Sequence, residues 1–142
     1  MCNNEEKGNR CMAEILQVIL LLQRNAECGD SCLDSCDKGF LGCCTTTCVC
    51  NTRPVMLYLC CSNSDPLRMP ISKAFDEQVT SPVFRVEKLD GNCATFRVLA
   101  PSEEPINNGC LQPFVATNSF FTLNLDCLCC IRCLQDTCVD CV

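Results

Sequence analysis

Cysteine has the greatest capacity for chemistry in this chain and supplies 19 of its 142 residues. Most of these thiols fall in two clusters, the first made of Cys28, Cys32, Cys36, Cys43, Cys44, Cys48 and Cys50, and the second of Cys127, Cys129, Cys130, Cys133, Cys138 and Cys141. Such a density in a short chain is typical of a disulfide scaffold or a metal protein. Because the count is odd, at least one thiol stays free or bonds to another chain if the rest pair internally.

Histidine is absent, which removes the commonest general base and the commonest metal ligand. A cysteine nucleophile could not be paired with an imidazole, and a metal site would have to use thiolates and carboxylates. We therefore predict a protein that is not an enzyme, with no catalytic residues, no cofactor and no metal site.

Two C-x-x-C pairs keep a metal-binding alternative open. Cys130 with Cys133, and Cys138 with Cys141, resemble the halves of a zinc ribbon, which are usually separated by roughly 15–20 residues. Only four residues lie between these pairs, a spacing that suits a thiolate cluster better than a single tetrahedral ion. A zinc thiolate protein is thus the alternative to a disulfide-linked one. A thioredoxin-like role is disfavoured because no βαβ unit surrounds the pairs.

Disulfides between chains are favoured by the adjacent cysteines. A bond between neighbours such as Cys60 and Cys61 strains the intervening peptide, whereas in an extended strand the two thiols point to opposite faces and reach different partners. An isolated Cys93 fits a buried small hydrophobe instead, a role that Cys60 also allows. The candidate disulfide or cross-linking residues are Cys2, Cys11, Cys28, Cys32, Cys36, Cys43, Cys44, Cys48, Cys50, Cys60, Cys61, Cys110, Cys127, Cys129, Cys130, Cys133, Cys138 and Cys141.

Charge and hydropathy limit the partners. The net charge is −6 and no basic run occurs, so the chain lacks the electrostatic footprint of a nucleic-acid or anionic-lipid binder. The apolar run at residues 15–22 is shorter than the ~20 residues that cross a bilayer. It is also not followed by the small-residue cleavage site of a secretory signal. We therefore expect no nucleic-acid partner, no membrane insertion and no signal peptide.

We expect residues 1–142 to form a single domain with distinct segments at its two ends. We expect a flexible N-terminus at residues 1–10 and a helix at residues 11–26, where Ile15, Ile19 and Leu22 recur at helical spacing and Asn9 can serve as the N-cap.

Residues 27–53 form a Cys-rich segment that reads as loop, and a Cys-rich tail follows at residues 135–142. The tail is expected to be exposed and mobile, so that Cys138 and Cys141 contribute cross-links more than fold. The alternative is that they close a local loop onto Cys130 or Cys133.

The β body is assigned to residues 54–134. Its clearest part is a hairpin of residues 83–89 and 93–99 around Asp90-Gly91-Asn92. Alternation places Phe84 and Phe96 on an inner face and a cross-strand Arg97–Glu87 pair on a solvated outer face. A last strand through Phe121 is expected to run directly into residues 127–134. The pattern predicts a mainly β fold, an antiparallel β-sandwich-like domain with an N-terminal helix.

Four segments resemble those of the spore coat protein Y/Z family, the cysteine-rich coat and exosporium basal-layer proteins of Bacillus-type spores. They are NTRP at residues 51–54, SPVFRVE at 81–87, CATFRVL at 93–99 and LDCLCCIRCL at 125–134. The similarity covers roughly residues 11–134, and the second and fourth segments match no generic enzyme or metal motif. The tail at residues 137–142 and the dense cluster at residues 43–50 depart from the family pattern.

The resemblance implies a structural role. It suggests a self-assembling protein that forms a disulfide-cross-linked two-dimensional lattice around the spore, made in the mother-cell cytoplasm without a signal peptide. Its partners would be further copies of itself and other spore coat or exosporium proteins. The departures leave open whether the chain forms the lattice or anchors other spore-surface structures to it.

Overall fold

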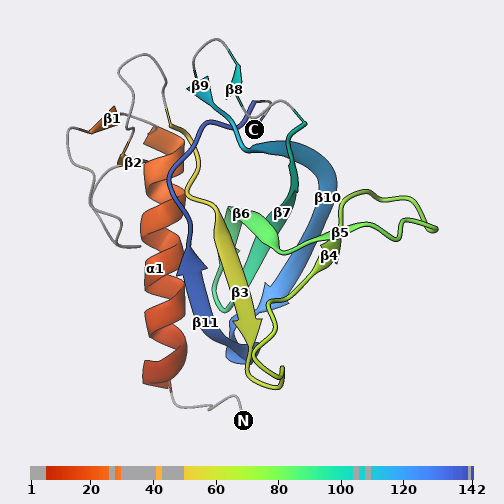
Figure 1. The fold of residues 1–142 in the computed structure, drawn as a ribbon. Helices are drawn as coiled ribbons and strands as arrows, with labels where there is room; N and C mark the ends of the chain where they lie inside the picture. The colour runs from red at the N-terminus through yellow and green to blue at the C-terminus, as the bar shows by residue number, and fades with distance from the viewer. Residues whose placement is uncertain are drawn as a thin grey trace.

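A computed structural model of the chain describes residues 6–25, 28–29, 41–42, 50–103, 106–107, 110–140 and 142. In chain order the elements are α1 (Glu6–Asn25), β1 (Cys28–Gly29), β2 (Leu41–Gly42), β3 (Val55–Leu59), β4 (Met69–Pro70), β5 (Thr80–Ser81), β6 (Val83–Asp90), β7 (Cys93–Pro101), β8 (Ile106–Asn107), β9 (Cys110–Leu111), β10 (Phe114–Asn124), the 3-10 helix η1 (Leu125–Cys127) and β11 (Leu128–Cys133). Figure 1 shows α1 lying alongside the long strands.

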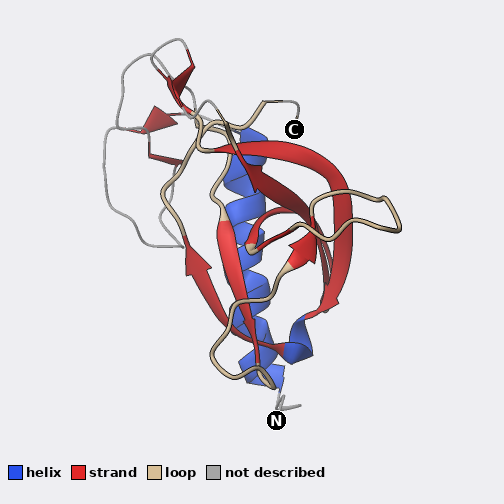
Figure 2. Cartoon of the chain, turned by 45° about the vertical axis from the view of Figure 1, so that its right-hand side comes forward, coloured by secondary structure: helices blue, strands red, loops and turns tan. Residues whose placement is uncertain are grey.

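The main sheet is strongly curled. Its strand order is β10-β7-β6-β3-β11, so β10 and β11 form opposite edges although they follow one another in the chain. In a flat sheet these edges would be about 19 Å apart, four times the usual spacing between strands. Only η1 joins them, and the four residue steps from Asn124 to Leu128 span at most ~14 Å. The sheet therefore has to bend, and Figure 2 shows its long edge strand β10 strongly curved, with α1 running alongside the strands.

The core lies between the curled sheet and α1. On the helix, Leu16, Ile19 and Leu20 are buried at the i, i+3 and i+4 spacing that forms one apolar face. The rings of Phe84, Phe96 and Phe121 contact one another on the sheet side, with centroids 4.8 to 6.3 Å apart. Phe84 and Phe96 thus lie on the inner face, as alternation predicted.

The helix begins earlier than the sequence indicated. It starts at Glu6, so Asn9 lies inside it and is not the N-cap, and residues 6–10 are helical and not a loose terminus. The prediction was wrong because it placed the start at the first apolar residues of the repeat. Residues 1–5 lie outside the described part of the chain.

The predicted hairpin is confirmed as β6 and β7. Asp90 pairs with Cys93, so the turn consists of Gly91 and Asn92. Gly91 has φ +58°, and a glycine at the first turn position is what a type II′ turn requires.

The last strand is not continuous, contrary to expectation. Asn124 ends β10, and its side chain accepts a hydrogen bond from the Asp126 backbone N–H at 3.0 Å. This cap starts η1, which carries the chain to the opposite edge of the sheet. Strand alternation across residues 121–134 is therefore broken. Leu128 is buried, whereas alternation in a continuous strand would place it on the same face as exposed Cys130 and Arg132.

The mainly β class, the antiparallel pairing and the N-terminal helix are confirmed. The sandwich is not. In the residues that the structure describes, α1 packs against β6 and η1, and its buried residues complete the core that a second sheet would complete in a sandwich. The apolar face of α1 supplies the surface that such a sheet would have provided.

Candidate cross-linking site

Free thiols are the chemically reactive groups of this fold. Among the cysteines whose side chains the structure describes, six are free. Five of them are exposed: Cys11, Cys61, Cys93, Cys127 and Cys130. Exposed thiols can meet thiols or disulfides of other chains.

The exposed thiols of the sheet lie at one end of the domain. Cys93 pairs with Asn124, the last residue of β10, and η1 with Cys127 follows directly. The Leu125 N–H donates to the Asn92 carbonyl at 2.9 Å, which joins the start of η1 to the β6–β7 turn. The Cys60 N–H donates to the Cys127 carbonyl at 3.0 Å, which brings the end of β3 to the same place.

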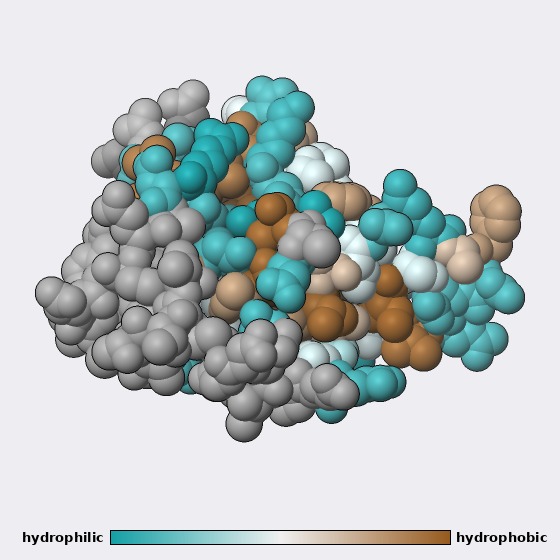
Figure 3. All heavy atoms as spheres, turned by 90° about the horizontal axis from the view of Figure 1, so that it is seen from above, coloured by the Kyte–Doolittle hydropathy of each residue, from teal (hydrophilic) through white to brown (hydrophobic). Residues whose placement is uncertain are grey.

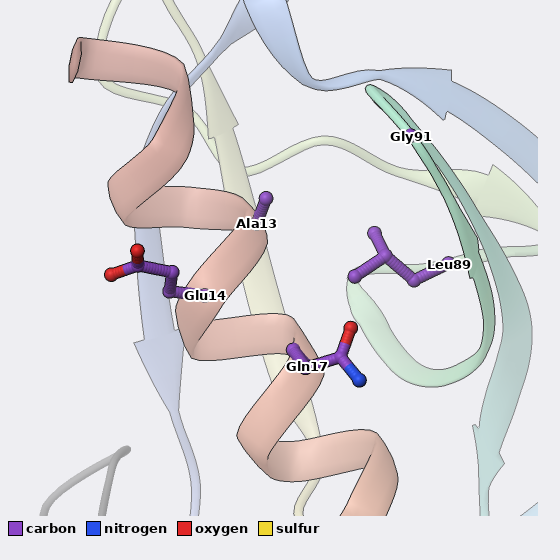
Figure 4. Close-up of a pocket in the computed structure, with 5 residues that line it drawn as sticks. All are labelled: Ala13, Glu14, Gln17, Leu89 and Gly91. Carbon is purple, nitrogen blue, oxygen red and sulfur yellow. The ribbon is translucent and has the colours of Figure 1, made fainter. Parts of the chain in front are cut away.

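Cys11 lies at the same end, on the N-terminal half of α1. A hollow of about 300 Å³ separates this half from the β6–β7 turn and is lined by Ala13, Glu14, Gln17, Leu89 and Gly91. Figure 4 shows Ala13 and Gln17 pointing toward Leu89, whereas Glu14 points away. We call this end of the domain, with its five exposed free thiols Cys11, Cys61, Cys93, Cys127 and Cys130, the thiol end.

A disulfide between Cys60 and Cys129 also belongs to the thiol end. The register of β11 on β3 shifts between Leu128 and Cys130, so that Cys129 forms a bulge in the edge strand. A bulge turns neighbouring side chains away from strict alternation. Cys129 and Cys130 are accordingly both exposed, although they are adjacent in the strand.

A second hollow, of about 360 Å³, lies beside this disulfide. Its lining residues are Tyr58, Leu59, Cys60, Ser62, Ser64, Cys129 and Cys130. The lining thus includes both cysteines of the disulfide and the free Cys130, together with aromatic, aliphatic and serine residues.

The opposite end of the sheet has cysteines of a different kind. Cys133 pairs with Val55 at the start of β3, and Cys50 precedes that strand. Both cysteines are disulfide-bonded, and Cys50 is only 6% exposed. Reagents in solution therefore reach Cys50 far less readily than the sulfurs of the thiol end.

The C-terminal segment, residues 134–140 and 142, packs on the body, which corrects the expectation of a mobile tail. Thr137 pairs with Thr52, and Val139 is completely buried beside Val83 and Leu99. The Asn51 side chain donates to the Val139 carbonyl at 2.8 Å and accepts from its N–H at 2.9 Å. The polar residues of this segment misled the prediction because their partners lie far away in the sequence.

Cys138, in this segment, is less accessible than the five thiols of the thiol end. Its thiol is half-buried and accepts a contact from the Gln112 side chain at 3.6 Å. Burial, and then the negative charge of Asp140, raise the pKa of this thiol, while the Gln112 contact opposes them. Because the thiolate is the nucleophile, a raised pKa lowers its reactivity near neutral pH.

The charged side chains of the sheet are less solvated than predicted. The expected Arg97–Glu87 ion pair is present at 2.9 Å, and Arg85 contacts the same carboxylate at 2.8 Å. Arg85 is only 7% exposed because Thr52 covers it and accepts a hydrogen bond from its Nε at 2.9 Å. Near the tail, Arg53 and Asp136 form a buried ion pair at 2.8 Å.

Sequence reasoning misjudged Cys93, which is exposed and free and is not a buried small hydrophobe. Cys60, one of the disulfide candidates, is bonded to Cys129. The signal for Cys93 was present, because alternation with inward-facing Ala94 and Phe96 already placed it on the outer face. Candidates whose side chains lie outside the described part of the chain are Cys2, Cys28, Cys32, Cys36, Cys43, Cys44, Cys48, Cys110 and Cys141.

Two further properties concern only the described residues. No group of three or more Cys, Asp or Glu side chains there is arranged to hold a metal ion. Likewise, α1 lacks the length of apolar sequence that a membrane span needs.

The comparison with protein families decides the identity. The family model for spore coat protein Z matches residues 1–136, which is nearly the whole chain. The chain belongs to the spore coat protein Z family. Membership gives it a structural role in the spore coat and a place at the spore surface. No curated protein and no solved structure matches the chain.

Proposed function

We propose that this spore coat family protein assembles with copies of itself into a disulfide-cross-linked two-dimensional shell of the spore coat or exosporium. The observation that carries the proposal is the thiol end. Five exposed free thiols lie at this end. A domain of this size can fold on its hydrophobic core alone, so it does not need these thiols for its own stability. Thiols placed in this way are available to bond between chains.

The asymmetry of the domain supports the same proposal. Cys50 and Cys133 are already bonded at the opposite end, and Cys138 is half-buried with a raised pKa. Among the cysteines whose side chains the structure describes, the exposed free thiols are therefore all at one end. The loop between β4 and β5 projects from the body (Figure 3) and carries Phe75, which is fully exposed. An exposed ring of this size is available for non-covalent contact with a neighbouring molecule.

Electrophoresis in hot detergent without reductant tests the proposal. The wild-type chain is expected to give a ladder or an immobile band, and reductant should collapse it to the monomer. A five-serine variant, in which Cys11, Cys61, Cys93, Cys127 and Cys130 are replaced, should lose most of the ladder. Cys138→Ser is the matched control and should retain it.

Two results would contradict the proposal. A wild-type chain that runs only as a monomer would exclude covalent assembly, and an undiminished ladder from the five-serine variant would exclude the thiol end. Electron microscopy of the wild-type material shows separately whether the linked chains form ordered sheets.

A further inference from the structure

The Cys60–Cys129 disulfide differs from a buried structural bond in its surroundings. Cys129 is exposed, and both bonded cysteines line a hollow of about 360 Å³. Exchange requires a thiolate to approach one sulfur of the bond from outside, so access determines which disulfides react. Cys50 has no comparable access, because it is 6% exposed.

Each half of this disulfide is followed directly by an exposed free thiol, Cys61 after Cys60 and Cys130 after Cys129. Attack by such a thiol on its own neighbour would create a disulfide between adjacent residues, which strains the intervening peptide. A thiol of another molecule meets no such constraint. The arrangement thus disfavours these local exchanges and leaves the bond open to an incoming chain.

We propose that Cys60–Cys129 is an exchange site, through which a second copy of this chain becomes cross-linked without an oxidant. This inference rests on the proposed function and specifies its chemistry. The thiolate of a second copy, such as Cys130, attacks the Cys129 sulfur. One disulfide forms between the chains, the Cys60–Cys129 bond breaks, and Cys60 leaves as a thiolate. The attacking thiol releases a proton to solvent and the Cys60 thiolate can take one up, so the number of disulfides is unchanged.

The exchange can continue from chain to chain. The released Cys60 thiolate is the nucleophile for the Cys60–Cys129 bond of the next copy, so each link regenerates one thiolate. A second copy fits as the partner because the thiol end carries both the disulfide and the attacking thiols. When two copies meet through this end in a two-fold symmetric contact, the free thiols of each copy face the disulfide of the other.

The test mixes two forms of the whole chain without oxygen or any oxidant. The first is isotopically heavy and carries the five serine substitutions, so it keeps Cys60–Cys129 but has none of the five free thiols of the thiol end. The second is light wild-type chain. After quenching with N-ethylmaleimide, disulfide-linked peptides are identified by mass spectrometry. We expect heavy–light peptides joined through heavy Cys60 or Cys129, a matching loss of the heavy Cys60–Cys129 peptide, and an unchanged total of disulfides.

The control is the same heavy chain with Cys60→Ser and Cys129→Ser added, which should lose most of the heavy–light peptides. The exchange is wrong if heavy Cys60–Cys129 stays intact, or if heavy–light links form only through other residues. Wild-type chain exposed to air separates this failure from that of the proposed function. If it cross-links in air while the oxygen-free mixture does not react, exchange alone is refuted. If it never cross-links, the proposed function is refuted as well.

Discussion

Replacement of Val139 by alanine tests whether the C-terminal segment is part of the folded domain. Val139 is completely buried and packs in a cluster with Val83 and Leu99. The change removes about two methylene equivalents, worth ~0.8 kcal/mol each in transfer free energy. The unfilled cavity adds to that loss. We therefore expect Val139→Ala to lower the free energy of unfolding by about 2–3 kcal/mol.

Urea denaturation followed by circular dichroism measures this effect. The measurement uses the five-serine background, which replaces only exposed side chains and is expected to reduce cross-linking between chains. Val142→Ala is the matched control, because Val142 lies in the same segment but is 41% exposed. It should change the free energy of unfolding by less than about 0.5 kcal/mol. If both substitutions change the free energy of unfolding by equally small amounts, the packing of the segment is refuted and the mobile tail expected from the sequence is supported.

Three further outcomes are expected, and urea denaturation measures the first and third. Asp136→Ala should destabilise the domain by about 3 kcal/mol, because it leaves the buried Arg53 guanidinium without this carboxylate; an effect no larger than that of exposed Asp140→Ala would contradict it. Because its pKa is raised by burial and by Asp140, Cys138 should be alkylated more slowly than exposed Cys61 at pH 8, and Asp140→Asn should speed the reaction of Cys138; a Cys138 rate that Asp140→Asn leaves unchanged would argue against the shift. Gly91→Ala should cost about 1–2 kcal/mol although no atom lies within 4 Å of the added Cβ, because the backbone φ is +58°; an unchanged midpoint would show that the turn adapts.

The local features of the fold were accessible from the sequence. The hairpin followed from Asp90-Gly91 between two alternating runs, and the buried face of α1 from the spacing of its apolar residues. These signals act within a few residues of one another. The same periodicity gave the Arg97–Glu87 pair.

Features set by distant contacts were not accessible in this way. The Asn51 side chain donates a hydrogen bond to the Val139 carbonyl, 88 residues away in the sequence. No local pattern in the C-terminal segment indicates this contact. The 3-10 helix η1 was also not predicted. Apolar and polar residues keep alternating in the sequence there, although the chain passes from one edge of the sheet to the other.

The candidate site was predicted by residue type but not by arrangement. Counting thiols identified cross-linking as the chemistry, and the adjacent pairs Cys60-Cys61 and Cys129-Cys130 pointed to different partners for neighbouring sulfurs. That the exposed free thiols gather at one end depends on the curl of the sheet, which brings η1, the β6–β7 turn and the end of β3 together. Cys93 joins them for the same reason.

Disulfide mapping of assembled wild-type chain tests the central claim most directly. Assembly from an equal mixture of heavy and light chains, followed by alkylation and mass spectrometry, distinguishes bonds between chains from bonds within one. Most heavy–light peptides should be joined through Cys11, Cys61, Cys93, Cys127 or Cys130, or through the exchanged sulfurs Cys60 and Cys129. Heavy–light peptides joined mainly through Cys50, Cys133 or Cys138, with the thiol end still free, would contradict the account.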